Sequence, residues 1–177
     1  MRVIAGTLGG RQFDAPKGQR THPMSDKVRG GLFNTLGDIS GLNVLDAFAG
    51  SGALSLEAIS RGAAHATAID IDKNAHQTLM ENVRQLDVDD AVKSIRANAS
   101  GWSDNNLNSV FDLVFAAPPY DDLRLPLLQK LTKHVKDNGL YVLDWPGKSN
   151  TPEFEGLEVI KEQDYGDAKL VFYRKIS

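Results

Sequence analysis

Two acidic side chains end two apolar segments of this sequence, with a glycine-rich turn between them. Asp46 closes "NVLD" and Asp70 closes "HATAID". In the intervening "AFAGSG", Gly50 and Gly52 allow a tight turn and let a ligand approach the bare backbone. A carboxylate at the position of Asp70 can accept hydrogen bonds from both hydroxyls of a ribose. The pattern is typical of a site for an adenosine-type cofactor.

The glycine turn alone does not select the cofactor, because nicotinamide, flavin and S-adenosylmethionine sites all use one. Asp46 favours S-adenosylmethionine, since a carboxylate suits the amino group of that ligand and would repel a pyrophosphate. The third glycine of the dinucleotide fingerprint is also absent, and Ser55 stands in its place. Asn98 falls where the adenine ring would lie, although a single Asn is equally typical of a turn.

A second candidate site is "VFAAPPYDD", residues 114–122, an apolar run that stops at two prolines and a tyrosine. A similar segment closes the active site of enzymes that methylate amino groups on nucleobases or proteins. In those enzymes the residue before the prolines is Asp or Asn, whereas here it is Ala117. Pro118, Pro119 and Tyr120 are expected to form the wall that holds a flipped base, with Tyr120 stacking on it.

Ala117 removes a group that such chemistry normally uses. An exocyclic amine is a poor nucleophile, because its lone pair is delocalised into the ring, and a side-chain acceptor helps to orient it and to stabilise the developing charge. Three interpretations stay open. Asp121 or Asp122 substitutes for the missing acceptor; the chain binds its ligands but methylates poorly or not at all; or the backbone carbonyls of the turn suffice.

The elements that must position these residues alternate between strand and helix patterns. Apolar runs at 43–48, 65–70, 91–97, 111–117 and 140–145 predict strands, and amphipathic stretches at 53–61, 72–86 and 123–136 predict helices. The segments 157–165 and 168–175 predict a closing hairpin at the sheet edge. We therefore expect a doubly wound, Rossmann-like α/β fold, mostly parallel, with a C-terminal antiparallel hairpin.

The N-terminal residues predict a small extension to this fold. The segments 2–6 and 11–16 flank the turn "TLGG" and indicate a hairpin, and a helix is expected from Ser25, which would be its N-cap. The 177 residues suit a single domain, which we divide into an extension at 1–40 and a catalytic core at 41–177.

Composition narrows the class of protein further. The chain has no cysteine, its four histidines are scattered without metal-ligand spacing, and no apolar run approaches the roughly 20 residues that cross a membrane. We expect no metal, no membrane contact and a cytoplasmic location. The net charge is -3, but residues 1–36 carry six basic and two acidic side chains, a balance of +4 that leaves -7 for the remainder. A polyanion is therefore expected to meet the N-terminal segment.

Four stretches together resemble the RsmD family of bacterial methyltransferases, which modify an exocyclic guanine amine of small-subunit ribosomal RNA. They are "MRVIAGTLGGRQFDAPKGQRTHPMSDKVRGGLFNTL", "LDAFAGSGALSLEAISRGA", "FDLVFAAPPY" and "YGDAKLVFYR". The resemblance spans nearly the whole chain and is most specific in the N-terminal stretch. The sequence departs from the family pattern at His22, Met24, Gly30, Gly31 and Ala117.

The resemblance implies S-adenosylmethionine as the cofactor and assigns residues to the site. The implied cofactor contacts are Asp46, Gly50, Gly52, Asp70, Asn98 and Ser25. The implied RNA-binding residues are Pro23, Arg29 and Asn34, and the positive charge of the N-terminal segment adds Arg11 and Arg20. The expected partner is small-subunit ribosomal RNA, free or in an assembling small subunit, with the protein acting as a monomer. The alternatives are methylation of DNA adenine or protein glutamine, and a non-catalytic RNA-binding protein on the same scaffold.

Overall fold

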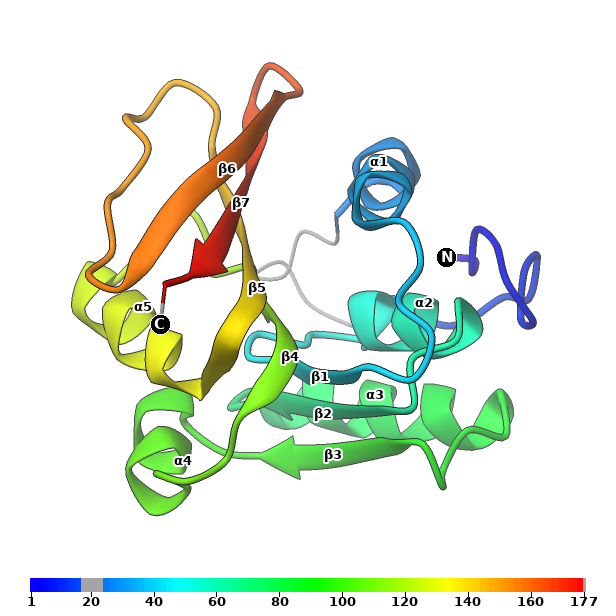
Figure 1. Cartoon of the computed structure of the whole chain (residues 1–177). Coiled ribbons are helices and arrows are strands. Elements are labelled where there is room, and N and C mark those ends of the chain that lie inside the picture. The colour runs from blue at the N-terminus through cyan, green and yellow to red at the C-terminus, as the bar shows by residue number, and fades with distance from the viewer. Residues whose placement is uncertain (17–23, 177) are drawn as a thin grey trace.

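The computed structural model describes residues 1–16 and 24–176 of the chain (Figure 1). The helices are α1 (Asp26–Leu36), α2 (Ala53–Ser60), α3 (Lys73–Gln85), α4 (Ala99–Asn105), α5 (Leu125–Leu131) and the 3-10 turn η1 (Thr132–His134). The strands are β1 (Asn43–Asp46), β2 (His65–Asp70), β3 (Val92–Arg96), β4 (Phe111–Ala116), β5 (Val135–Pro146), β6 (Leu157–Asp164) and β7 (Ala168–Lys175).

The described strands form one sheet in the order β3-β2-β1-β4-β5-β7-β6. The pairs from β3 to β5 are parallel, and β7 lies antiparallel between β5 and β6. The chain order reverses between β1 and β4, and ligands of open α/β sheets bind at the carboxyl ends of strands at such a reversal. The predicted doubly wound sheet and its C-terminal hairpin are confirmed.

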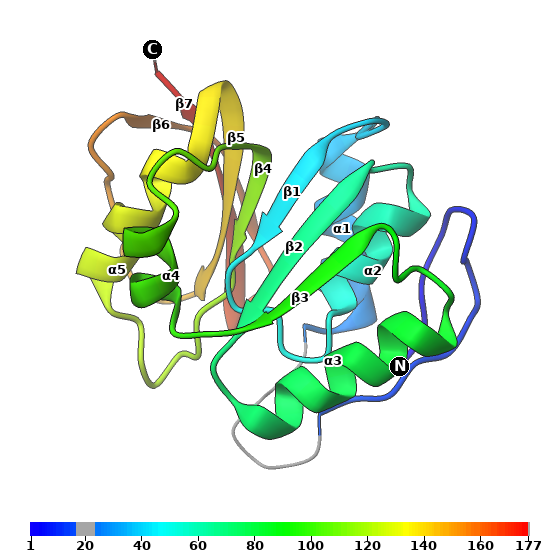
Figure 2. The same cartoon turned by 90° about the horizontal axis from the view of Figure 1, so that it is seen from below.

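Two layers of helices cover the sheet, one on each face (Figure 2). Residues of α1, α2 and α3 pack with Leu113, Phe115 and Val142 in one core cluster. Residues of α4 and α5 pack with Val114 and Leu143 in the other. The central strands β1 and β4 are therefore buried on both faces, which explains why β4 is almost uniformly apolar in sequence.

The structure differs from the sequence-based expectation in three elements. Helix α4 was not predicted, because Ser, Gly, Asp and Asn favour turns over helices; Trp102 holds it in place against His134 and Phe111. The helix expected at 123–136 ends early, and β5 begins at Val135, which pairs with Phe111. The N-terminal hairpin is reduced to a single antiparallel bridge between Arg2 and Gln12.

A buried carboxylate anchors the N-terminal coil to α2. Glu57 accepts hydrogen bonds from the backbone N–H groups of Ile4 and Ala5 at 2.8 and 3.1 Å. Its oxygens also lie 2.8 Å from Nε of Arg61 and 3.6 Å from Nε of Arg29. Because the side chains of Glu57 and Arg29 are both completely buried, removal of either one would leave a buried charge with one ion-pair partner fewer.

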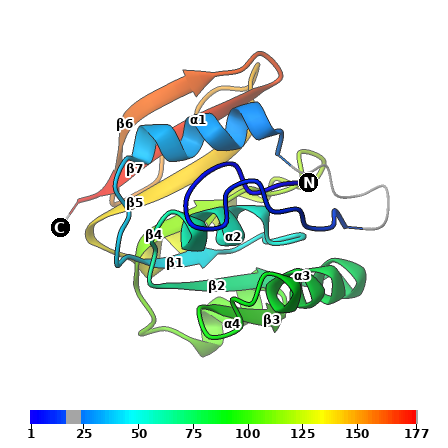
Figure 3. The same ribbon diagram turned by 90° about the vertical axis from the view of Figure 1, so that its right-hand side faces the viewer.

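Helix α1 lies between this coil and the β6–β7 hairpin (Figure 3). Ser25 caps the helix as predicted, accepting the N–H of Val28 at 3.2 Å. On the hairpin side, Thr35 accepts a hydrogen bond from Gln163, and the hydroxyl of Tyr165 lies where a side chain at Gly31 would begin. The glycine at position 31 therefore allows the hairpin turn to pack directly against the helix backbone.

Alanine should stabilise the protein at Gly30 but not at Gly31. At Gly30 the added methyl group meets only Cδ1 of Ile4, at 3.6 Å. Helix propensity should then raise the free energy of unfolding by about 0.5–1 kcal/mol. At Gly31 the methyl group overlaps Tyr165, so the same gain should be lost. Urea unfolding measures both variants, and equal stabilisation would show that Tyr165 does not constrain Gly31.

Candidate functional site

Four of the six predicted cofactor residues, Asp46, Gly50, Gly52 and Asp70, come together where β1 and β2 end. Asp46 ends β1, Asp70 ends the parallel neighbour β2, and the turn containing Gly50 lies between them. The N–H of Gly50 donates to Oδ2 of Asp70 at 2.9 Å. This bond links the glycine turn to the second acid, so the two sequence motifs form one site.

Asp46 is buried, with 1% of its surface exposed, and one of its oxygens has a polar partner. The hydroxyl of Ser55 donates to Oδ2 at 2.8 Å, whereas Oδ1 accepts no hydrogen bond among the described residues. Burial raises the pKa of Asp46 to about 7, an effect that Ser55 partly offsets and the charge of Asp70 reinforces. A buried acceptor without a donor is costly, so the site favours a ligand that brings a cationic donor to Oδ1.

Asp70 is held by backbone donors on both sides. Its Oδ1 accepts the N–H of Asp72 at 2.9 Å, in addition to the bond from Gly50 to Oδ2. Partial burial raises its pKa, and these two bonds oppose the rise. Each oxygen keeps a second lone pair, so the fixed carboxylate is able to accept from the two hydroxyls of a ribose.

Gly52 fits the turn for two separate reasons. Its φ of 90° lies in the left-handed region that favours glycine. A Cβ at this position would also collide with Cδ1 of Leu79 on α3. The turn therefore delivers the first N–H groups of α2 to the strand ends, where helix N-termini attract carboxylates.

Asn98 and Ser25, the other two expected cofactor residues, both act as helix caps. Oδ1 of Asn98 accepts the N–H groups of Ser100 and Gly101 at the start of α4. The amide nitrogen of Asn98 donates no hydrogen bond to a described residue and can donate to an adenine ring. Ser25 is exposed at the start of α1, and its hydroxyl hydrogen is free to donate while its oxygen caps the helix.

The proline turn follows β4, next to β1 in the sheet. Ala117 is half-buried against the first core cluster, Pro118 is buried, and Pro119 is exposed. Tyr120 is 43% exposed, and its hydroxyl donates to Oδ1 of Asp144 at 2.5 Å. Burial, together with this bond and the negative charge of Asp144, raises the pKa of Tyr120. The ring is therefore fixed at one end and open to solvent along its side.

The expected RNA-binding residues do not all lie on one surface. The prediction that Arg29 binds RNA is wrong. Its guanidinium is completely buried and donates to the carbonyl oxygen of Arg2 and to Asp26, so it cannot contact RNA. Arg11 is exposed near the end of α3, where it donates to the carbonyl oxygen of Gln85. Asn34 is exposed on α1. Arg20 and Pro23 lie outside the described residues.

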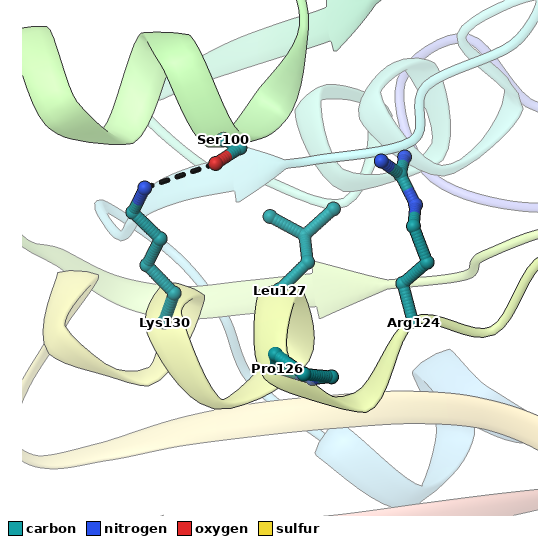
Figure 4. A pocket seen from close by; sticks show the side chains of 5 residues that line it. All are labelled: Ser100, Arg124, Pro126, Leu127 and Lys130. Atoms are coloured by element: carbon teal, nitrogen blue, oxygen red, sulfur yellow. Dashed lines mark hydrogen bonds between the residues drawn. The ribbon is translucent and has the colours of Figure 1, made fainter.

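A shallow hollow of about 430 Å³ lies between α4 and α5 (Figure 4). Ser100, Arg124, Pro126, Leu127 and Lys130 line it. Lys130 donates to Ser100 at 2.9 Å and pairs with Asp104, so its charge is already compensated. The hollow shares no lining residue with the acidic strand ends, and we do not place the cofactor in it.

Among the described residues, no three His, Cys, Asp or Glu side chains gather in a way that could hold a metal ion. In residues 1–16 and 24–176, no helix is long and apolar enough to cross a membrane.

Sequence reasoning missed three side chains that shape the site. Ser55 was noted only as the absent third glycine, although it is the partner of Asp46. Glu57 gave no signal in a helix pattern, since the backbone N–H groups that it binds, those of Ile4 and Ala5, lie about 50 residues away in sequence. Asp144 did carry a signal: like Asp46 and Asp70, it is an acid near the end of an apolar strand.

The buried acid decides the class of cofactor. A dinucleotide site would not place Asp46 beneath the pyrophosphate, because two negative groups would meet in a water-poor environment. The ammonium group of an amino-acid moiety suits the free oxygen, and Asp70 suits a ribose. The fold and site define an S-adenosylmethionine-dependent methyltransferase.

Comparison with known proteins agrees with this class. The family model described as "Conserved hypothetical protein 95" matches residues 1–174, and the chain belongs to that family. "Putative rRNA methyltransferase YlbH" of Bacillus subtilis is 32% identical over 188 residues, covering 99% of each chain. "Ribosomal RNA small subunit methyltransferase D" of Escherichia coli is 37% identical over 140 residues, covering 78% of this chain and 68% of that protein.

A solved structure extends the likeness to the whole fold. "Putative methyltransferase yhhF from Escherichia coli" matches with a TM-score of 0.86 at 30% identity, covering 99% of this chain and 98% of that one. Together these matches confirm the resemblance to the RsmD family.

The buried acid should make stability depend on pH. The pKa of Asp46 is about 7 in the folded protein against 3.8 for an unperturbed group. Between these values the folded state holds a proton that the unfolded state releases. The free energy of unfolding should therefore fall as pH rises through this window, by at most about 4 kcal/mol from Asp46.

Asp46→Asn should remove this contribution, because an amide does not titrate. Denaturant unfolding of both proteins between pH 5 and pH 8 measures the difference in slope. If the two proteins lose stability in parallel, Asp46 is not the group responsible.

Proposed function

We propose that this protein transfers a methyl group from S-adenosylmethionine to the exocyclic amine of a guanine in small-subunit ribosomal RNA. The relatives named above support ribosomal RNA as the substrate. The observation that carries the proposal is the position of the proline turn. Asp46 pairs with Phe115 of β4, so the turn that begins at Ala117 starts two residues beyond the level of the buried acid.

The residues at this edge of the sheet have separate roles in the reaction. Asp46 and Asp70 hold the two ends of the cofactor, which supplies an activated methyl group. A guanine cannot reach it from within a paired helix, so the base must be flipped out. Tyr120 offers an exposed aromatic side on which a base can stack, while its bond to Asp144 holds the ring in place.

The N-terminal extension is our proposed surface for the rest of the RNA. Residues 1–40 form this extension and residues 41–177 the catalytic core of one domain that acts as a cytoplasmic monomer. Arg11, Asn34 and Lys27 are exposed on the extension and are available to phosphates. Arg29 adds no surface charge because Glu57 and Asp26 compensate it.

Methyl transfer to RNA tests the proposal directly. Ribosomal RNA and small subunits from cells lacking this protein are incubated with isotope-labelled S-adenosylmethionine, and the labelled nucleotide is mapped. The expected product is a guanine methylated on its exocyclic amine. Label in protein glutamine, or in adenine when DNA is added as a competing substrate, would show that the enzyme acts on another amine. Tight RNA binding without any label would favour the non-catalytic alternative.

Loss of the Tyr120 ring should weaken capture of the flipped base. Tyr120→Ala removes the stacking surface, and affinity for substrate RNA should fall by about 1–3 kcal/mol. Tyr120→Phe keeps the ring and should retain most of that affinity. Titration of labelled RNA in the presence of S-adenosylhomocysteine measures binding without turnover. Unchanged affinity in Tyr120→Ala would show that this turn does not hold the base.

A charge reversal tests the role of the extension. Arg11→Glu should weaken RNA binding and lower the slope of log affinity against log salt concentration by roughly one or two phosphate contacts. Arg174→Glu is a matched control, because Arg174 is likewise an exposed arginine that donates to one backbone carbonyl, that of Asn138. Equal effects of the two substitutions would mean that RNA affinity depends on the net charge of the protein and not on the N-terminal extension.

A further inference from the structure

The proline turn lacks its side-chain acceptor, and the acids that follow it do not replace that group. Asp121 and Asp122 are both exposed. The carboxylate of Asp122 lies 3.4 Å from Nε of Arg124, and its N–H donates to the carbonyl oxygen of Pro119. These contacts hold the segment on the surface beyond the turn, so a side chain that replaces the acceptor would come from another element.

The register of the sheet brings a different acid to this position. Strands β4 and β5 are parallel, with Ala116 opposite Leu143. The next residues along the two strands are Ala117 and Asp144. Neighbouring strands lie about 4.8 Å apart, which a carboxylate side chain can span. Asp144 therefore stands beside the position where the usual acid would begin.

The alternation of side chains shows that both residues use the same face of the sheet. Phe115 and Ala117 pack in the first core cluster together with Val142. Ala116 and Leu143 pack in the second cluster, on the opposite face. Since side chains two residues apart on a strand share a face, Asp144 follows Val142 onto the face of Ala117.

A hydrogen bond then fixes the Asp144 carboxylate against the turn. Oδ1 accepts the Tyr120 hydroxyl at 2.5 Å, and the same hydroxyl lies 3.3 Å from the carbonyl oxygen of Trp145. Oδ2 accepts no hydrogen bond from the described residues, and the side chain of Asp144 is only half-buried. One oxygen is thus anchored to the residue that stacks the base, and the other is available to a ligand.

We propose that Asp144 replaces the acceptor that Ala117 lacks, its free oxygen accepting an N–H of the target amine. The amine nitrogen forms a bond to the methyl carbon as the carbon–sulfur bond breaks and its electron pair stays on sulfur. The proton facing Asp144 then passes to the carboxylate and on to solvent. Burial raises the pKa of Asp144, which brings the carboxylate closer to the basicity needed to take that proton.

This inference rests on the proposed amine methylation, and its test uses paired substitutions. Asp144→Ala should lower the single-turnover rate of methyl transfer to RNA about a hundred- to a thousandfold, the typical cost of losing one positioned group. Affinity for S-adenosylhomocysteine, measured by calorimetry, should stay within twofold. Adding Ala117→Asp to Asp144→Ala should recover at least tenfold of the lost rate, because the two positions lie side by side.

The controls separate an acceptor from a residue that only holds Tyr120. Tyr120→Phe removes the same hydrogen bond but leaves the carboxylate, and it should lose far less rate than Asp144→Ala. Asp121→Ala should leave the rate unchanged. Equal losses in Tyr120→Phe and Asp144→Ala, with no recovery by Ala117→Asp, would overturn the proposal. Full activity of Asp144→Ala would overturn it as well.

A binding measurement keeps the inference testable if wild-type protein transfers no methyl group. Guanosine and inosine differ by the exocyclic amine alone, and saturation-transfer NMR compares their binding in the presence of S-adenosylhomocysteine. Wild-type protein should prefer guanosine, and Asp144→Ala should bind both equally. An unchanged preference in Asp144→Ala contradicts the role of Asp144, whereas absent turnover with a normal preference contradicts the proposed function alone.

Discussion

The position of the N-terminal extension depends on one buried carboxylate, that of Glu57. It lies in α2, the helix that starts at the cofactor turn, and it accepts backbone donors from the N-terminal coil while it compensates Arg29 of α1. Desolvation makes such a charge cluster expensive unless every member is present. The same helix therefore begins at the glycine turn and fixes the N-terminal coil through Glu57.

At the open edge of the sheet, acids on neighbouring strands have different environments and so different tasks. Asp46 is sealed from water, with one oxygen lacking a donor, and suits a cationic group. Asp70 is held by backbone N–H groups and suits hydroxyls. Asp144 is half-buried and tethered by Tyr120, which suits an amine. The order of these strands in the sheet brings the three acids to one edge of the sheet.

Local pattern was enough to predict most of the fold and the strand ends and glycine turn where Asp46, Gly50 and Asp70 come together. Apolar runs located the five parallel strands, and glycines next to terminal acids located the turn. Contacts between residues that are far apart in sequence could not be predicted from local pattern. Arg29 has the sequence context of a basic surface residue, but it forms a buried ion pair with Glu57. Only strand register places Asp144 beside Ala117, and α4 forms because Trp102 packs against His134.

The central claim is that the cofactor lies across the ends of β1 and β2, with its reactive end toward the proline turn. A crystal structure with S-adenosylhomocysteine tests it most directly. The account predicts the ligand's amino group within hydrogen-bonding distance of Oδ1 of Asp46, its ribose on Asp70, and its sulfur facing Ala117 and Asp144. A ligand seated in the hollow between α4 and α5, or one whose amino group leaves Asp46 without a donor, would contradict the account.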